Sequence, residues 1–346
     1  MSYSHLSILK EILPDDQIEI LASYFNNLVG SAINNITISK TSRVLNCTSD
    51  IAMKVLMKCY SEGILAISYG IRCPECNTLI KRIDDLSLLS SDEITCYSCD
   101  ESFLTNPRQV EILFSLIDSS IFILGQHETE EFEASARPVA LEDSLENIIL
   151  AGGINNLLFN PTDDEYKELR RMFDSISKKQ STTKQAGDTL ENFTRYLFGL
   201  CSVFSTAGIK TETNQIDCFV RNKMFLNYGV LYTIGGRFFI ECKNESKTPK
   251  GEYMSKLHSI IKNTNGKNSL IKLGIIISKE EGPNTFKKLA NKIFLSENII
   301  MIAICGKELD EFIKNKGNLL DLLERKIDEI TLDSITDLCE AGLYNT

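Results

Sequence analysis

Two Cys-x-x-Cys pairs constrain the folding of the N-terminal part of this chain more than any other feature of its sequence. The first pair is Cys73 and Cys76, and the second, Cys96 and Cys99, follows after nineteen intervening residues. Each pair can direct two thiolates at one metal ion, and two pairs complete the tetrahedral ligand set that Zn²⁺ prefers. The spacing predicts a zinc ribbon over residues 71–105, with a structural Zn²⁺ because four thiolates leave no open coordination position. The alternatives are a redox-active pair of thiols and a chance spacing.

The other seven cysteines stand singly, most of them among apolar neighbours. This usage fits a reducing compartment better than a disulfide framework. No run approaches the roughly 20 apolar residues that span a bilayer, and the chain does not start with the basic and then apolar stretch of an export signal. We therefore expect a cytoplasmic protein that does not enter a membrane. At 346 residues the chain is long enough for two or three folded units.

Residues 1–70 are expected to form helices followed by a strand. Apolar residues recur with helical spacing over 15–28, a short helix is expected within 36–46, and another helix covers 51–60 before a strand at 64–69. This order resembles the winged helix-turn-helix of many regulatory DNA-binding domains. The alternative is a three-helix packing module that contacts no nucleic acid.

Residues 106–186 are expected to form a mainly helical connector. Helices are predicted within 106–126, over 141–151 and over 163–178. The polar run 178–187 then marks the start of the last domain.

From Gly187 onward, predicted helices and strands alternate. The strands are expected at 214–220, 229–234, 237–243, 270–278 and 299–305, and the helices at 188–204, 251–263, 284–296 and, as two terminal helices, within 307–329. The later strands are continuous apolar runs, which is typical of strands buried on both faces. The alternation predicts a mixed sheet with helices on both sides over residues 187–330, followed by a tail at 331–346.

Three charged residues interrupt the apolar strands of this domain. In the strand 237–243, alternation places Glu241 and Lys243 on the same face. Asp217 interrupts the equally apolar strand 214–220. Burial of an unpaired carboxylate is costly, so such charges usually have a partner or a metal ion. The ordinary alternative is a surface ion pair between Glu241 and Lys243.

These residue types suit phosphodiester hydrolysis. Asp217, Glu241 and the backbone carbonyl of Cys242 could hold Mg²⁺ or Mn²⁺ through oxygen ligands. The metal ion would polarise the phosphate and lower the pKa of a bound water, while Lys243 orients that water or stabilises the developing charge. Glu191, on the first helix of the domain, could reach the same site.

Local charge agrees with a nucleic-acid substrate for this domain. The chain has a net charge of −10, but residues 187–300 hold 16 Lys+Arg against 10 Asp+Glu. Residues 111–186, in contrast, hold 7 Lys+Arg against 14 Asp+Glu. A locally basic domain can bind a phosphate backbone within an acidic chain.

The order Glu191, Ile216-Asp217 and Ile240-Glu241-Cys242-Lys243 resembles the PD-(D/E)XK nuclease superfamily, and within it the restriction-endonuclease-like branch with Mrr-type catalytic domains. The resemblance covers about residues 187–306, and 23 residues separate the aspartate from the glutamate. It implies that Asp217 and Glu241 are metal ligands, Lys243 the catalytic lysine and Glu191 an auxiliary carboxylate. Ile216 stands where the family motif has proline.

The resemblance leads to an expected fold and function. The fold is an α/β C-terminal domain with a restriction-endonuclease-like sheet, after a mainly α winged-helix region with a zinc ribbon. The function is a metal-dependent DNA endonuclease, and the biology of the family suggests prokaryotic defence against foreign DNA. The N-terminal region would bind DNA or a protein partner, and a homodimer is compatible because each site cuts one strand. The alternatives are a non-catalytic adaptor on a nuclease-like scaffold and a nuclease for RNA or branched DNA.

Overall fold

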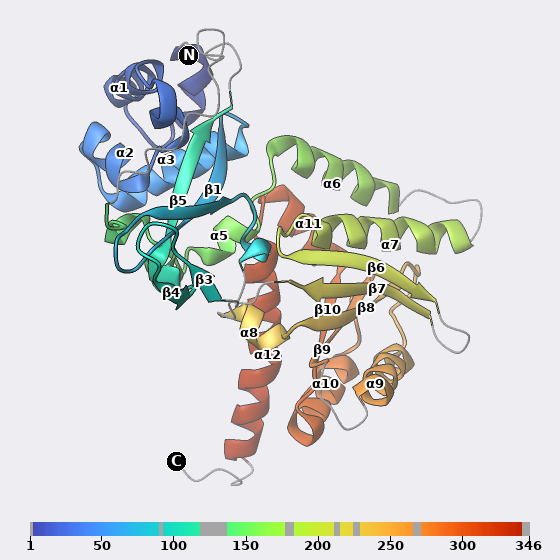
Figure 1. Cartoon of the computed structure of the whole chain (residues 1–346). Helices are drawn as coiled ribbons and strands as arrows, with labels where there is room; N and C mark the ends of the chain where they lie inside the picture. The colour runs from blue at the N-terminus through green and yellow to red at the C-terminus, as the bar shows by residue number, and fades with distance from the viewer. Residues whose placement is uncertain are drawn as a thin grey trace. The chain divides into compact units, whose positions relative to one another are not determined.

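The computed structural model of the chain describes residues 3–89, 93–117, 137–176, 183–210, 215–223, 229–265 and 271–340. The protein is mixed α/β and divides into two compact units, Met1–Ile154 and Asn155–Thr346 (Figure 1). None of the helices in these ranges combines the length and the apolar character that a membrane span requires.

The first unit opens with helices in the order expected from the apolar spacing. They are the 3-10 helices η1 (Tyr3–Leu9) and η2 (Gly30–Asn34) and the α-helices α1 (Asp15–Asn26), α2 (Ile38–Leu45) and α3 (Ser49–Ser61). The hydroxyls of Thr37 and Thr48 accept hydrogen bonds from backbone N–H groups in the first turns of α2 and α3. Asn46 ends α2 with a left-handed φ of 48°. These caps keep α2 and α3 apart as two short helices that pack on each other.

A three-stranded antiparallel sheet follows, in the order β2-β1-β5. Its strands are β1 (Leu65–Arg72), β2 (Leu79–Ile83) and β5 (Val110–Leu116). The expectation of a helix within 106–126 is therefore wrong for Val110–Leu116, and residues 118–126 lie outside the described ranges. An apolar run of seven residues fits a buried strand as well as a helix, and pairing with β1 decides the outcome.

Smaller elements complete the first unit. They are the hairpin of β3 (Glu93–Thr95) and β4 (Ser102–Leu104), the 3-10 helices η3 (Leu86–Leu88), η4 (Pro107–Gln109) and η6 (Leu141–Asp143), and α4 (Leu145–Leu150). Asp143 ties this last segment to the helices, because it accepts hydrogen bonds from the backbone N–H of Ser39 at 2.8 Å and from its hydroxyl at 2.5 Å. Much of the expected connector thus belongs to the first unit.

The second unit is built on a five-stranded mixed sheet in the order β10-β9-β8-β7-β6. The strands are β6 (Phe204–Lys210), β7 (Gln215–Asn222), β8 (Arg237–Lys243), β9 (Leu273–Ser278) and β10 (Ile300–Cys305). Strands β8, β9 and β10 run parallel, whereas β7 is antiparallel to both of its neighbours. Every residue of β9 is buried, as expected for a strand covered on both faces.

Helices cover both faces of this sheet (Figure 1). The helices from residue 154 onward are α5 (Ile154–Leu158), α6 (Asp163–Ile176), α7 (Thr183–Gly199), α8 (Val230–Ile234), α9 (Gly251–Asn265), α10 (Asn284–Glu297), α11 (Gly306–Lys314) and α12 (Leu319–Glu340). Among them α6 packs on α7, and α8 on α12. On the α7 face, the ring of Phe198 packs 5.9 Å from that of Phe238 in β8. On the opposite face, Ile261 of α9 lies over Gly274 of β9, where an added Cβ would approach it to 2.7 Å. Glycine at this position lets the helix come close to the sheet.

Two expectations about the secondary structure of this unit are wrong. Residues 230–234 form the helix α8 instead of a strand, between Gly229 and Gly235 with positive φ values of 51° and 70°. The first helix ends at Gly199 instead of reaching residue 204, and the strand β6 begins at Phe204. The unit also starts earlier than Gly187, because α6 precedes α7 and packs against it.

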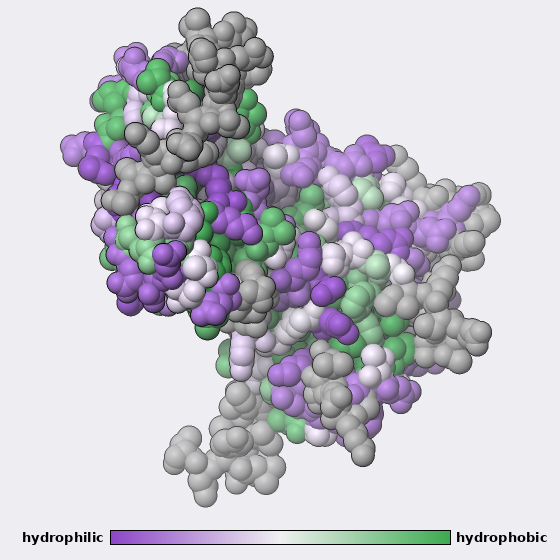
Figure 2. Space-filling view, viewed as in Figure 1, coloured by the Kyte–Doolittle hydropathy of each residue, from purple (hydrophilic) through white to green (hydrophobic). Residues whose placement is uncertain are grey.

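Among the described residues on the face shown in Figure 2, green areas alternate with purple ones. Among the described residues, exposed large apolar side chains occur on many different elements, with Leu150, Val29 and Tyr232 the most exposed. Single exposed apolar residues of this kind are ordinary in folded proteins.

Candidate functional site

Asp217 lies in β7 at a β-bulge. Across β6 and β7 the register passes from Ala207 opposite Phe219 to Ile209 opposite Ile216. Two residues of β7, Asp217 and Cys218, therefore face the single residue Gly208 of β6. Bulges bend a strand and re-aim its side chains, and they recur beside active sites.

The side chain of Asp217 is turned toward the neighbouring strand β8. The ladder between β7 and β8 ends at Cys218 opposite Ile240. Beyond this pair, a side-chain hydrogen bond replaces the backbone hydrogen bonds between the two strands. Oδ2 of Asp217 accepts it from the backbone N–H of Cys242 at 2.8 Å. Asp217 is only 7% exposed, so this hydrogen bond is needed to offset the cost of burial.

Glu241 and Lys243 share the face of β8 that α9 covers. The Lys243 ammonium donates a hydrogen bond to Glu241 Oε1 at 2.6 Å, and it lies 4.9 Å from the centre of the Tyr253 ring in α9. Lys256 of α9 is 3.9 Å from the same carboxylate oxygen. Glu241 is 3% exposed, so the prediction of a charge embedded in the strand is met and the pair is largely buried.

The charge state of Lys243 follows from these neighbours. Burial lowers the pKa of Lys243, but the hydrogen bond and charge of Glu241 and the charge of Asp217 outweigh it. The pKa of Lys243 is consequently raised above its ordinary value, and the ammonium stays protonated at neutral pH. A fixed positive charge therefore lies beside the two carboxylates.

Glu191 lies on α7, the helix that covers the opposite face of β8. Its Oε2 is 3.6 Å from Nη1 of Arg195, one turn further along the helix. Among the described residues, the four ribbon cysteines are the group of three or more metal-ligating side chains whose ligand atoms all lie within 4.8 Å. Glu191, Asp217 and Glu241 are not a group of this kind, so the assignment of Glu191 to the same site stays a prediction.

The sequence reasoning missed two side chains that contact this site, Arg195 and Tyr253. Arg195 Nη1 donates a hydrogen bond to the main-chain carbonyl of Asp217 at 3.1 Å. The hydroxyl of Tyr253 donates one to Glu245 Oε1 at 2.6 Å, which holds the ring beneath Lys243. Their spacing from the motif, four residues after Glu191 and ten after Lys243, was the available signal.

No family model matches the chain, and no curated protein matches it. The resemblance to a nuclease superfamily therefore depends on the residues described above.

The four cysteines of the first unit come together as the spacing predicts. Their Sγ atoms all lie within 4.8 Å of one another, with Cys73 3.5 Å from Cys99 and Cys76 3.6 Å from Cys96. In each pair the first cysteine accepts a backbone hydrogen bond from the residue four further on, Asn77 or Asp100, and both of these residues have positive φ. The two knuckles thus have the same turn, and the four thiols could hold a metal ion such as Zn²⁺.

One thiol of this group is already disposed to lose its proton. Cys76 Sγ lies 3.2 Å from the hydroxyl of Thr78. Hydrogen bonds from the side chain and the backbone of Thr78 lower the pKa of Cys76 to about 6. A metal ion binds the thiolate form, so these hydrogen bonds prepare Cys76 for loading. In the same group, a backbone hydrogen bond lowers the pKa of Cys99, but burial and hydrogen bonds to the neighbouring thiols outweigh it and raise that pKa to about 12.

Metal analysis of the purified protein should find about one zinc ion per chain. Cys76→Ser should lose that zinc, because three thiolates and a hydroxyl bind it less well than four thiolates. Cys47→Ser, which changes a half-buried cysteine outside the cluster, serves as the control and should keep the full complement. A folded wild-type sample with no zinc would contradict the ribbon assignment.

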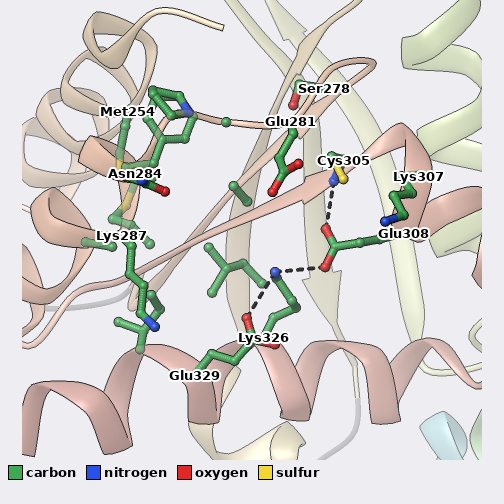
Figure 3. Close-up of a pocket in the computed structure, with 18 of the residues that line it drawn as sticks. Met254, Ser278, Glu281, Asn284, Lys287, Cys305, Lys307, Glu308, Lys326 and Glu329 are labelled. Atoms are coloured by element: carbon green, nitrogen blue, oxygen red, sulfur yellow. Dashed lines mark hydrogen bonds and ion pairs between the residues drawn. The ribbon is translucent and has the colours of Figure 1, made fainter. Parts of the chain in front are cut away.

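A separate cavity of about 480 Å³ opens at the carboxyl ends of β9 and β10. Figure 3 shows Glu281 and Lys326 among the side chains around it. Lys326 of α12 is held there by Glu308 at 2.9 Å and Glu329 at 3.1 Å. Neither Asp217 nor the other predicted catalytic residues line this cavity, so it is distinct from the candidate catalytic group.

Proposed function

We propose that the second unit is a metal-dependent endonuclease that hydrolyses phosphodiester bonds in DNA. The observation that carries the proposal is the buried hydrogen bond from the Cys242 N–H to Asp217, which fixes one carboxylate at the end of β8 beside Glu241 and Lys243. Buried charges are paired or coordinate a metal ion, and such a group at a strand end is a candidate functional site.

Asp217, Glu241 and the backbone carbonyl of Cys242 would hold Mg²⁺ or Mn²⁺. The N–H and C=O groups of a strand residue point toward the same neighbouring strand. The Cys242 carbonyl is therefore directed, like its N–H, toward the side where Asp217 lies. Two carboxylate oxygens and a carbonyl oxygen form the hard ligand set that these ions prefer.

The bound ion would polarise the phosphate and activate a water. Lys243 would orient that water or stabilise the negative charge that develops on the phosphate oxygens. Its hydrogen bond to Glu241 and its position over Tyr253 keep the ammonium at this place. A phosphate chain would be attracted by the 16 Lys+Arg against 10 Asp+Glu of residues 187–300.

For the first unit, charge favours a protein partner over DNA. Residues 1–154 hold 22 Asp+Glu and 10 Lys+Arg. Affinity for DNA depends mainly on cations that neutralise phosphates, and an acidic unit opposes this. Its role in the proposal is to direct the nuclease through a partner protein, with the zinc ribbon as a rigid part of that module.

The test is a cleavage panel of wild type and Lys243→Ala on double-stranded, single-stranded and branched DNA and on RNA, with Mg²⁺ or Mn²⁺ and with EDTA. We expect metal-dependent cleavage of DNA by wild type and a loss of about a hundredfold or more in the variant, the size observed when one charge-stabilising group is removed. Lys288→Ala, which removes an exposed lysine of α10, is the control and should cleave like wild type. Cleavage restricted to RNA would show that the substrate is RNA and not DNA. No cleavage by wild type would favour a non-catalytic adaptor.

A further inference from the structure

A second interaction holds Asp217 in place through its main chain. Arg195 of α7 donates from Nη1 to the Asp217 carbonyl at 3.1 Å and from Nη2 to Asn192 at 2.8 Å. The same Nη1 lies 3.6 Å from a carboxylate oxygen of Glu191. The guanidinium is therefore anchored within its own helix at the point where it contacts β7.

The contact falls on the bulge. Asp217 and Cys218 share one partner position on β6, and a bulge leaves one residue of the longer strand without its ladder hydrogen bonds. The Arg195 side chain supplies a hydrogen bond to that segment from outside the sheet. A planar guanidinium that bonds several acceptors at once fixes the backbone more tightly than an ammonium would.

Gly208, opposite the bulge, makes room for this guanidinium. An added Cβ at Gly208 would lie 3.1 Å from Arg195 Nη1 and 3.6 Å from the Asp217 carbonyl. Three features thus contribute to this one contact: the small residue on β6, the bulge on β7 and the arginine on α7.

We propose that Arg195 is a positioning residue, which together with Glu191 holds the bulge so that the Asp217 carboxylate points toward Cys242 and the metal position. The proposal rests on the proposed function. It gives Glu191 a role that does not require it to contact the metal ion: its charge orients Arg195, and Arg195 fixes Asp217. Groups that orient a ligand typically contribute a factor of 10 to 100 in metal affinity.

The test measures Mn²⁺ binding by electron paramagnetic resonance on the full-length protein, without any substrate. We expect Arg195→Met to weaken Mn²⁺ binding about 10- to 100-fold and Arg195→Lys to recover part of it, since an ammonium can still donate to the carbonyl. Gly208→Ala should weaken binding in the same direction by displacing the guanidinium. Arg221→Met, at an exposed position of the same strand β7, should bind like wild type.

Two controls separate this role from a general loss of structure and from the proposed function. The thermal unfolding midpoint of Arg195→Lys and Gly208→Ala should remain near that of wild type while the Mn²⁺ affinity changes. If Arg195→Met and Gly208→Ala bind Mn²⁺ as tightly as wild type while Asp217→Asn does not bind it, the positioning role is wrong and the metal site stands. If wild type itself binds no Mn²⁺, the proposed function fails and this inference fails with it.

Discussion

Replacing Asp217 by asparagine is expected to reduce metal-dependent DNA cleavage by about a hundredfold or more. The change removes the negative charge from a proposed metal ligand, whereas changes to groups that only orient a ligand already cost roughly 10- to 100-fold. An asparagine carbonyl oxygen can still accept the Cys242 N–H, so the local fold should persist. Initial rates of plasmid cleavage at several Mg²⁺ concentrations would measure the loss.

Asp328→Asn is the matched control, because Asp328 is an exposed aspartate of α12 and not one of the proposed ligands. It should cleave at the wild-type rate. Full activity of Asp217→Asn, in a preparation that is free of contaminating nuclease, would remove Asp217 from the catalytic group. A rate that recovers at high Mg²⁺ would instead show that Asp217 contributes affinity and that chemistry proceeds without its charge.

Replacing Glu111 by glutamine is expected to destabilise the first unit by about 3–5 kcal/mol, the cost of leaving a buried charge without its partner. Glu111 is fully buried in β5 and accepts a hydrogen bond from Arg72 of β1 at 2.8 Å, and Arg137 pairs with its other oxygen. Arg72 is itself 4% exposed in its side chain and cannot turn to solvent. Amide hydrogen exchange of β1 and β5 reports on this unit alone, and it should accelerate by about a hundredfold or more.

A double variant distinguishes the unpaired charge from a simple packing defect. Arg72→Met with Glu111→Leu removes both charges, and such replacements are often close to neutral. The double variant should therefore be more stable than Glu111→Gln. Glu146→Gln breaks the more exposed pair with Arg108 in the same unit and should change stability by less than about 1 kcal/mol. Equal losses in the single and double variants would contradict the account.

The sequence was most informative where a local pattern coincided with burial. Strand β8 was predicted over its full length, 237–243, because its residues are mostly apolar and its two charged residues, Glu241 and Lys243, are two positions apart, as on one face of a strand. The ribbon cysteines were predicted from spacing alone, since two knuckles of this kind bring four thiols together whatever surrounds them. The proximity of Glu241 to Lys243 followed from alternation along a single strand.

The sequence was least informative where pairing with another segment of the chain decides the local structure. The apolar runs at 110–116 and 230–234 look alike, yet the first forms β5 because β1 pairs with it, and the second forms α8 between two glycines with positive φ. The bulge at Asp217 depends on the register between two strands, which no local pattern reveals. The contact of Arg195 with Asp217 depends on that bulge, so it was out of reach for the same reason.

The order of the sheet has a consequence for how the protein folds. Strands β6, β7 and β8 are consecutive and antiparallel, whereas β9 and β10 join them only through the crossover helices α9 and α10. Pairings between neighbours in sequence close short loops and form early, while parallel pairings wait for long connections to be ordered. The meander that carries Asp217 and Glu241 is thus expected to assemble first, and the parallel half then adds the strands that exclude water from one side of it.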